Sequence, residues 1–175
     1  MSKLKAKKWT LLYTEISKLG EGGNADVYLV EDSRSGKRYA LKELRSSNRS
    51  EEKKSRFVSE IQIARDNCTI IPGIIPVIDY SMEDYWYTMP IAQQIMGCVN
   101  GMSLDEIING VLQLCETLGR LHEKGIHHRD IKPSNIYYYD GRFSFGDFGL
   151  VDFQDNDDFT KSDRGWVRYL RLHQR

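Results

Sequence analysis

The chain has 175 residues, and its 25 basic and 25 acidic side chains give a formal net charge of +0. This balance excludes the strong global attraction to nucleic acid or to acidic membrane surfaces that a basic protein shows, so we expect no nucleic-acid or membrane partner. Because no apolar run reaches the length of a membrane span and the start of the chain lacks a secretory signal, we expect a cytoplasmic protein.

The first half of the chain predicts a sheet with one helix. Runs with the composition of strands are separated by Gly-rich or acidic turns. Strands are expected at residues 15–19, 27–30, 38–44, 74–78 and 85–89. The pattern from Asn48 to Glu51 matches a capping box and predicts a helix that runs to about Asp66.

The second half is helical at first. Ser103 and Glu106 form a second capping box, and apolar residues at helical spacing follow it to Lys124 and Gly125, where a cation and a glycine are typical of a helix end. Residues 136–139 and 142–145 flank Asp-Gly, a strong signal for a hairpin turn.

The most specific signal lies on the loop at residues 127–135, His-His-Arg-Asp-Ile-Lys-Pro-Ser-Asn. Its Asp-x-Lys-x-x-Asn spacing places a base (Asp130), a cation (Lys132) and a metal ligand (Asn135) on one short segment. Asp147, in Asp-Phe-Gly, follows twelve residues after Asn135 and offers a second metal ligand. Each residue alone fits a cap or a turn, but the combination favours a site that moves a phosphoryl group.

Two earlier motifs agree with this chemistry. Gly20-Glu21-Gly22-Gly23-Asn24-Ala25-Asp26-Val27 joins two predicted strands, and small residues let backbone approach phosphates. By itself it is also typical of a plain turn. Strand alternation places Ala40 and Lys42 on one face, although a lone Lys on a strand is most often solvated. The following helix offers Glu60 as an anionic partner, with Glu51 and Glu52 as competitors in its first turn.

Together these motifs resemble the eukaryotic-type Ser/Thr protein kinase family, whose fold is α+β. The resemblance implies a five-stranded antiparallel N-lobe sheet with one helix and a partial, mainly helical C-lobe. Residues 1–175 would form a partial kinase domain, with the N-lobe and the approach to the hinge at 1–91. An incomplete C-lobe with the catalytic loop and the start of the activation loop would occupy 92–175. The implied activity is transfer of the γ-phosphoryl group of MgATP to a Ser or Thr hydroxyl of a protein substrate.

The resemblance also implies roles for single residues. Asp130 would orient the substrate hydroxyl, Lys132 would neutralise the phosphoryl group, and Lys42, held by Glu60, would bridge two phosphates. Magnesium would be held by Asn135 and Asp147. The remaining positions that match the nucleotide site are Gly20, Gly22, Gly23, Ala25, Val27, Ala40, Met89, Pro90, Ala92 and Tyr137. Two of these depart from the family pattern, because Ala25 replaces a third glycine and Tyr137 replaces an aliphatic residue.

The resemblance ends after residue 163, and residues 164–175 do not match the family. One hypothesis is a frameshift, because a shifted frame after Gly165 can restore the Ala-Pro-Glu motif that the family carries there. A truncated C-lobe would expose apolar surface on the helix at 103–124 and permit self-association. We therefore expect weak or no phosphotransfer by this chain alone. The alternative function is a kinase-derived nucleotide-binding or interaction module with little or no catalysis.

Overall fold

The computed structural model describes residues 8–153, so the segment at 164–175, which does not match the family, lies outside the described residues. Within the described part the chain divides into two compact units. The first contains residues up to 65 together with 75–91, and the second contains residues 66–74 and those from 92 onward. Residues 66–74 thus belong with the second unit, although they precede the last two strands of the first.

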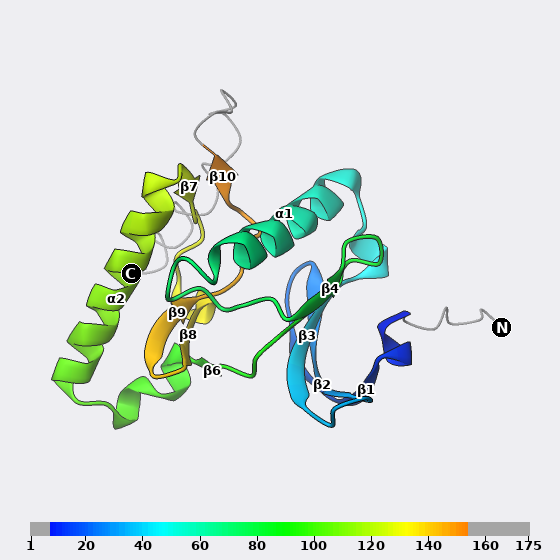
Figure 1. Ribbon diagram of the computed structural model, residues 1–175, viewed down its shortest axis with the longest axis horizontal. Coiled ribbons are helices and arrows are strands. Elements are labelled where there is room, and N and C mark those ends of the chain that lie inside the picture. The colour runs from blue at the N-terminus through cyan, green and yellow to red at the C-terminus, as the bar shows by residue number, and fades with distance from the viewer. Residues whose placement is uncertain (1–7, 154–175) are drawn as a thin grey trace, which may run out of the picture. The chain divides into compact units, whose positions relative to one another are not determined.

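The first unit is a five-stranded antiparallel sheet in the order β1-β2-β3-β5-β4, with one long helix (Figure 1). The strands are β1 (Tyr13–Glu21), β2 (Ala25–Asp32), β3 (Arg38–Leu44), β4 (Asp79–Ser81) and β5 (Trp86–Met89). The helix is α1 (Glu51–Asn67), and short 3-10 turns occupy Lys8–Leu11 and Ser46–Asn48. The predicted sheet with one helix is confirmed.

The strand predicted at residues 74–78 is wrong. The fourth strand is β4, which begins at Asp79, where the Asp79 amide donates to the Thr88 hydroxyl at 3.1 Å. Ile74 and Ile75 are 4% and 5% exposed, whereas Ile78 is 49% exposed, so the start of the apolar run is buried without forming a strand of the sheet. An apolar run of this length signals burial but does not specify which backbone pairing follows.

The capping box predicted from Asn48 to Glu51 is also wrong. Residues 46–48 form a 3-10 turn, and α1 begins at Glu51. The residue directly before the helix is Ser50, whose hydroxyl accepts from the Lys53 amide at 3.4 Å. Serine is as good a cap as asparagine, so the local sequence offered two competing starts.

Alternation along the strands gives the sheet of the first unit two different faces. One face buries an aromatic cluster against the N-terminal turn, made of Trp9, Tyr13, Tyr28, Val30, Leu41 and Trp86. The other face packs against α1 through Ala25, Leu44, Phe57, Ile61 and Tyr87. In β3 the register places Ala40, Lys42 and Leu44 toward this second face and Leu41 toward the first.

The second unit contains the helix α2 (Leu104–Glu123) and two small sheets. One sheet has the order β6-β8-β9, and the other pairs β10 with β7. The strands are β6 (Gln93–Gln94), β7 (Ile126–His127), β8 (Ile136–Tyr139), β9 (Arg142–Phe145) and β10 (Asp152–Phe153). Short 3-10 turns occupy Ile95–Gly97, Val99–Gly101 and Pro133–Asn135.

The local predictions for this unit are confirmed. Ser103 and Glu106 form the predicted capping box at the start of α2. The predicted hairpin joins β8 to β9, and its central residues Asp140 and Gly141 have φ of 50° and 74°. Positive φ at both central residues is what the Asp-Gly pair supplies most readily.

A glycine lets α2 approach β9 closely. A Cβ on Gly110 would lie 2.4 Å from the ring of Phe143, which is 4% exposed. Glycine inside a helix destabilises the helix by roughly 1 kcal/mol relative to alanine. At position 110 this loss is accompanied by closer packing of α2 on β9.

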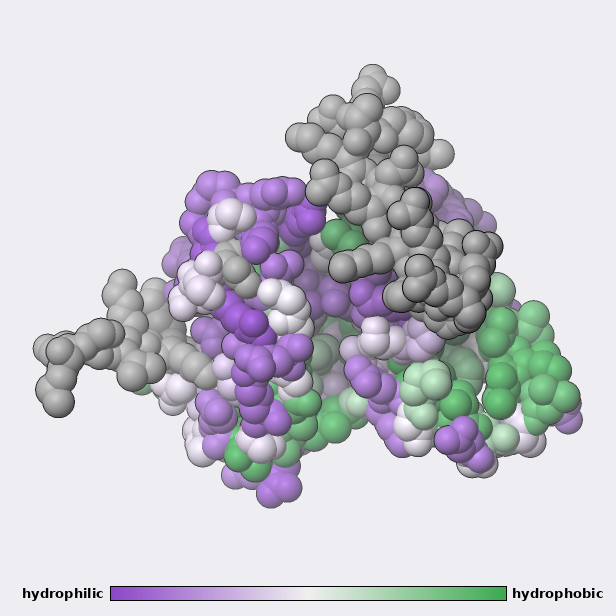
Figure 2. Space-filling view, turned by 180° about the vertical axis from the view of Figure 1, so that it is seen from behind, coloured by the Kyte–Doolittle hydropathy of each residue, from purple (hydrophilic) through white to green (hydrophobic). Residues whose placement is uncertain are grey.

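Part of the apolar surface of α2 is exposed. Leu104 is 71% exposed, Leu112 56%, Val111 49% and Ile108 48%. In Figure 2 hydrophobic side chains gather over α2 at the right-hand side. The exposed apolar surface expected on this helix is therefore present. No helix within residues 8–153 is both long and apolar enough to span a bilayer.

Candidate active site

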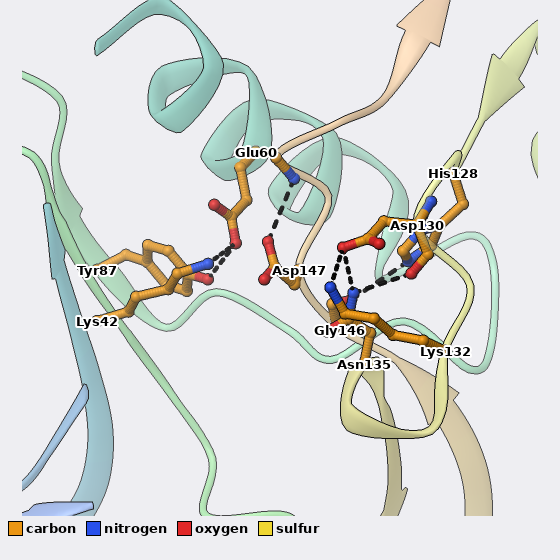
Figure 3. A network of polar contacts seen from close by, with 10 residues as sticks. Lys42, Glu60, Tyr87, His128, Asp130, Lys132, Asn135, Gly146 and Asp147 are labelled. Carbon is orange, nitrogen blue, oxygen red and sulfur yellow. Dashed lines mark hydrogen bonds and ion pairs between the residues drawn. The ribbon is translucent and has the colours of Figure 1, made fainter. Parts of the chain in front are cut away.

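A buried charged cluster lies in the first unit. The Lys42 ammonium donates to the Oε1 atom of Glu60 at 2.6 Å, and the Tyr87 hydroxyl donates to the same oxygen at 2.7 Å (Figure 3). The side chains of Lys42 and Glu60 are only 12% and 4% exposed. The predicted contact between Lys42 and Glu60 is thus present, and Tyr87 adds a donor that sequence reasoning missed.

The fold explains how these three residues meet. Lys42 and Tyr87 are directly opposite in the pairing of β3 with β5, and their side chains lie on the face that packs against α1. Glu60 stands between Phe57 and Ile61 on the buried face of α1. A buried carboxylate on an otherwise apolar face requires a cation and hydrogen bonds.

The competing acids of α1 bind elsewhere. Glu51 contacts Lys54 at 2.6 Å and Glu52 contacts Arg56 at 2.7 Å, both within the helix surface. Each belongs to an exposed i,i+3 or i,i+4 pair of the kind that stabilises helices slightly. Neither acid therefore competes for Lys42.

Three further predicted nucleotide-site residues share the Lys42 face of the sheet. Val27 pairs with Lys42 across β2 and β3, and Ala40 pairs with Met89 across β3 and β5. In an antiparallel pair, directly opposite residues point to the same face. The sheet therefore presents Val27, Ala40 and Met89 beside Lys42.

The glycine-rich segment contains the end of β1, the turn at residues 22–24 and the start of β2. The Gly22 amide donates to the Ala25 carbonyl at 2.9 Å. Among the described glycines, positive φ occurs only at Gly36, Gly73, Gly125 and Gly141. The backbone conformation therefore does not require glycine at Gly20, Gly22 or Gly23, and a Cβ at Gly20 or Gly23 would meet no atom within 4 Å.

Ala25 differs from the other members of this segment. It is 7% exposed and belongs to the cluster with Leu44, Phe57, Ile61 and Tyr87. Its side chain packs in the core facing α1, so any contact with a nucleotide would come from its backbone.

An ion cluster beside this turn was missed by sequence reasoning. Asp26 contacts Arg45 at 2.8 Å and Lys18 at 3.1 Å, and Glu21 contacts Lys18 at 2.8 Å. Burial alone would raise the pKa of Asp26, but hydrogen bonds from Arg45 and Lys18 lower the pKa below its usual value. The Arg45 amide also donates to the Asn24 carbonyl at 3.0 Å, so the cluster fixes both sides of the turn.

A second charged cluster lies on the loop after β7 in the second unit. The Lys132 ammonium donates to the Asp130 Oδ2 atom at 2.6 Å, and the Asn135 amide donates to the same oxygen at 2.9 Å (Figure 3). Asn135 also donates to the Asp130 carbonyl at 2.9 Å. The side chains of Lys132 and Asp130 are 41% and 20% exposed. The structure thus brings all three predicted loop residues together around one carboxylate.

His128 braces this loop from inside. It is 1% exposed, and its Nδ1 atom accepts from the Asp130 amide at 3.4 Å. Its Nε2 atom lies 3.2 Å from the Gly146 carbonyl, and its ring packs against Phe145 and Phe148. Burial lowers the pKa of His128 although Asp147 and Asp130 act in the opposite direction. A neutral imidazole that accepts at Nδ1 and donates at Nε2 satisfies both contacts.

The predicted metal ligands lie at the two ends of the β8–β9 hairpin. Asn135 is 4% exposed and directly precedes β8, and Asp147 follows β9 with a φ of 60°. The side-chain nitrogen of Asn135 donates to Asp130, so the side-chain oxygen of Asn135 is the atom that could bind a cation. Carboxylate and amide oxygens are the donors that Mg²⁺ prefers, and Mg²⁺ usually takes only one or two protein carboxylates plus phosphate oxygens. No cluster of three or more His, Cys, Asp or Glu that would suit a metal occurs within residues 8–153.

The other predicted nucleotide-site residues are spread along the chain. Pro90 and Ala92 lie in the segment between β5 and β6, and both are half-buried. Tyr137 is in β8, where it pairs with Gln94 and Ser144.

Comparison with known proteins identifies the family. Residues 13–170 match the protein kinase domain family. Because this match covers most of the chain and its five-stranded sheet with one helix has the architecture expected of that family, the chain belongs to the protein kinase family. Its fold is the protein kinase fold.

Similar proteins include bacterial Ser/Thr kinases. The chain is 33% identical over 152 residues to the serine/threonine-protein kinase PknD of Chlamydia muridarum and to that of Chlamydia trachomatis. It is 31% identical over 150 residues to PknD of Chlamydia caviae. Each alignment covers 71% of this chain and 15% of the relative, so the chain spans a small part of these proteins.

Proposed function

We propose that this chain carries the active-site residues of a Ser/Thr protein kinase that transfers the γ-phosphoryl group of ATP to a protein hydroxyl. The observation that carries the proposal is the cluster of Asp130, Lys132 and Asn135 around one carboxylate oxygen. A base, a cation and an amide oxygen donor on one braced loop are the groups that phosphoryl transfer requires. Membership of the protein kinase family and similarity to Ser/Thr kinases support the same reaction.

In the proposed reaction the substrate hydroxyl oxygen forms a bond to the γ-phosphorus while the bond to the departing ADP oxygen breaks. Asp130 orients the hydroxyl and accepts its proton as negative charge moves toward the leaving group. Lys132 stabilises the charge on the transferring group, because its ammonium lies beside Asp130. Bracing by His128 keeps the Asp130 backbone fixed, which favours reaction from a prearranged geometry.

Nucleotide contacts are proposed for the residues of each unit by itself. Lys42, fixed by Glu60, would bind phosphate oxygens, and the backbone of Gly20 at the end of β1 and of Gly22 and Gly23 in the following turn would contact the phosphates. Asn135 and Asp147 would hold Mg²⁺, which neutralises phosphate charge when bound. The adenine contacts are assigned to Val27, Ala40, Met89, the Pro90 carbonyl, the Ala92 amide and Tyr137.

The test is the intact mass of the purified chain after incubation with MgATP and a generic basic protein. Phosphate added to either protein by the wild-type chain, and absent with Asp130→Ala, supports the proposal. Absence of phosphate in a wild-type sample shown to be folded by circular dichroism contradicts catalysis by this chain. We also propose that the substrate is a protein with a Ser or Thr hydroxyl and that the chain is cytoplasmic.

A second candidate is a nucleotide-binding or interaction module with little or no catalysis. The observation that favours it is the exposed apolar surface of α2 formed by Leu104, Ile108, Val111 and Leu112. Apolar patches of this kind mark association surfaces. Sedimentation of the wild-type chain beside Leu112→Lys tests it, since a concentration-dependent mass in the wild type alone is expected if α2 mediates self-association.

A further inference from the structure

We propose that Tyr87 is a positioning residue for the Lys42–Glu60 pair, and that its hydroxyl holds the Glu60 carboxylate in place when Lys42 engages phosphate. This inference rests on the proposed function, because it assigns Tyr87 a part in nucleotide binding. Tyr87, Lys42 and Glu60 all belong to the first unit.

The geometry gives the carboxylate two donors on one oxygen. Glu60 Oε1 accepts from Lys42 at 2.6 Å and from the Tyr87 hydroxyl at 2.7 Å (Figure 3). Glu60 is 3% exposed and Tyr87 is 5% exposed, so the hydroxyl bond is shielded from water. A hydrogen bond to an ionised acceptor in a buried setting is stronger than one between neutral groups.

Core packing alone does not account for tyrosine at this position. The ring packs against Phe57, with 5.6 Å between ring centroids, and belongs to a cluster with Ala25, Leu44 and Ile61. Phenylalanine has the same ring and would fill the same space without a polar group to satisfy. The hydroxyl is therefore the part of Tyr87 whose contact is specific to Glu60.

The pairing of β3 with β5 places the hydrogen bond between Tyr87 and Glu60 beside Lys42. Tyr87 is directly opposite Lys42, and the Lys42 ammonium lies 5.9 Å from the centroid of the Tyr87 ring. A lysine that binds phosphate shares its ammonium protons between the phosphate and Glu60. The hydroxyl bond does not depend on that sharing, so it keeps the carboxylate oriented toward Lys42. A prearranged partner limits the conformational freedom that Lys42 would lose on binding.

The main test is a double-mutant cycle on affinity for ADP with Mg²⁺, measured by calorimetry. The variants are Tyr87→Phe, Glu60→Gln and the double variant, all of which preserve side-chain shape. Tyr87→Phe alone is expected to weaken binding by about tenfold, because a hydrogen bond to a charged group is lost. In the Glu60→Gln background the same change is expected to alter affinity by less than about twofold, because its partner has lost its charge.

The matched control is Tyr13→Phe. It removes a hydroxyl bond of similar length, 2.8 Å to Asp79, from a tyrosine that is 1% exposed and lies in the cluster on the other face of the sheet. This control is expected to change stability but not nucleotide affinity. An equal loss of affinity in Tyr13→Phe and Tyr87→Phe would show a general effect on the fold and would overturn the inference.

A second readout needs no nucleotide. The chain is prepared with carbon-13 at the lysine ε position, and the Lys42 resonance is identified by its loss in Lys42→Met. Tyr87→Phe is expected to shift this resonance and Tyr13→Phe to leave it unchanged. If wild type fails to bind the nucleotide, the proposed function fails, while the resonance still decides whether Tyr87 positions the pair. An unmoved Lys42 resonance in a folded Tyr87→Phe protein overturns the inference.

Discussion

The two charged clusters share one design but differ in burial. In the first unit one oxygen of Glu60 accepts from Lys42 and Tyr87, and in the second one oxygen of Asp130 accepts from Lys132 and Asn135. The Glu60 side chain is 4% exposed, whereas that of Asp130 is 20% exposed. The cations differ likewise, with 12% exposure for Lys42 and 41% for Lys132.

Because the two clusters differ in burial, we expect substitutions in them to have different effects on the free energy of unfolding and on catalysis. A buried ion pair leaves an uncompensated charge when one partner is removed, so its loss destabilises the fold. A partly solvated pair is screened by water and contributes little to the free energy of unfolding. We therefore expect substitutions in the first cluster to affect folding and binding together, and substitutions in the second to affect chemistry alone.

The largest expected loss of stability is for Glu60→Ala. Removing this carboxylate strands Lys42 in a buried site and should lower the free energy of unfolding by about 3–5 kcal/mol. The measurement is urea unfolding followed by circular dichroism. The control is Glu52→Ala, which removes an exposed partner of Arg56 and should cost less than about 0.5 kcal/mol. Equal losses in the two variants would contradict the burial argument.

The next effect concerns the scaffold of the second unit. Gly110→Ala places a Cβ against the Phe143 ring and should destabilise by about 1–3 kcal/mol despite the better helix propensity of alanine. Gly119→Ala, on the same helix with no atom within 4 Å of the new Cβ, should instead stabilise by up to about 1 kcal/mol. Chemical denaturation of both variants checks the opposite signs, and destabilisation by both would show that the Phe143 contact is not the cause.

The third effect is a pH dependence that originates at His128. Burial lowers the pKa of His128 in the folded protein below its ordinary value of 6.5. As the pH falls through 6.5, the imidazole therefore binds a proton more readily in the unfolded chain than in the folded protein. The free energy of unfolding is therefore highest above pH 6.5 and decreases as the pH falls below it. The decrease approaches about 1.4 kcal/mol per pH unit. Unfolding of wild type and His128→Leu between about pH 8 and about pH 5 measures the difference. The variant should show the shallower loss, and parallel curves would contradict the assignment to His128.

The smallest effect on stability is expected for Asp130→Asn. The side chain is partly solvated and asparagine retains one acceptor oxygen, so the free energy of unfolding should change by less than about 1 kcal/mol. The proposed phosphotransfer should nevertheless fall by a factor of about 10² or more, because the proton acceptor is lost. Denaturation and intact-mass assays on the same sample separate these effects. A large loss of stability would place Asp130 among the structural residues.

Sequence predicted those parts of the fold whose signals are local. The Ser103–Glu106 box and the Asp-Gly turn at 140–141 specify their own backbone conformation within a few residues, and the structure contains both. The helix at Glu51 was misassigned at its start because Asn48 and Ser50 are both good caps. The apolar run at 74–78 does not specify a strand, because such a run fits irregular backbone equally well, and β4 begins only at Asp79.

Long-range contacts of the site were predicted only in part. Lys42 and Glu60 were assigned to each other through resemblance to a family, since no spacing rule joins residues 18 positions apart. Tyr87 was missed, because a tyrosine on an apolar strand has the signature of a core residue. Only the register of β3 and β5, which places it opposite Lys42, reveals its contact with Glu60. Sequence reasoning also missed the cluster around Asp26, because Arg45 is 19 residues away and no spacing rule joins the two.

We propose that Lys42 binds the nucleotide and that Asp130 serves the transfer step. Calorimetric titration of Lys42→Met and Asp130→Asn with MgATP tests it most directly. Lys42→Met is expected to weaken binding by at least about tenfold, since a charge-assisted contact to phosphate is lost. Asp130→Asn is expected to bind within about twofold of wild type. Equal weakening in both variants, or none in Lys42→Met, would contradict the claim.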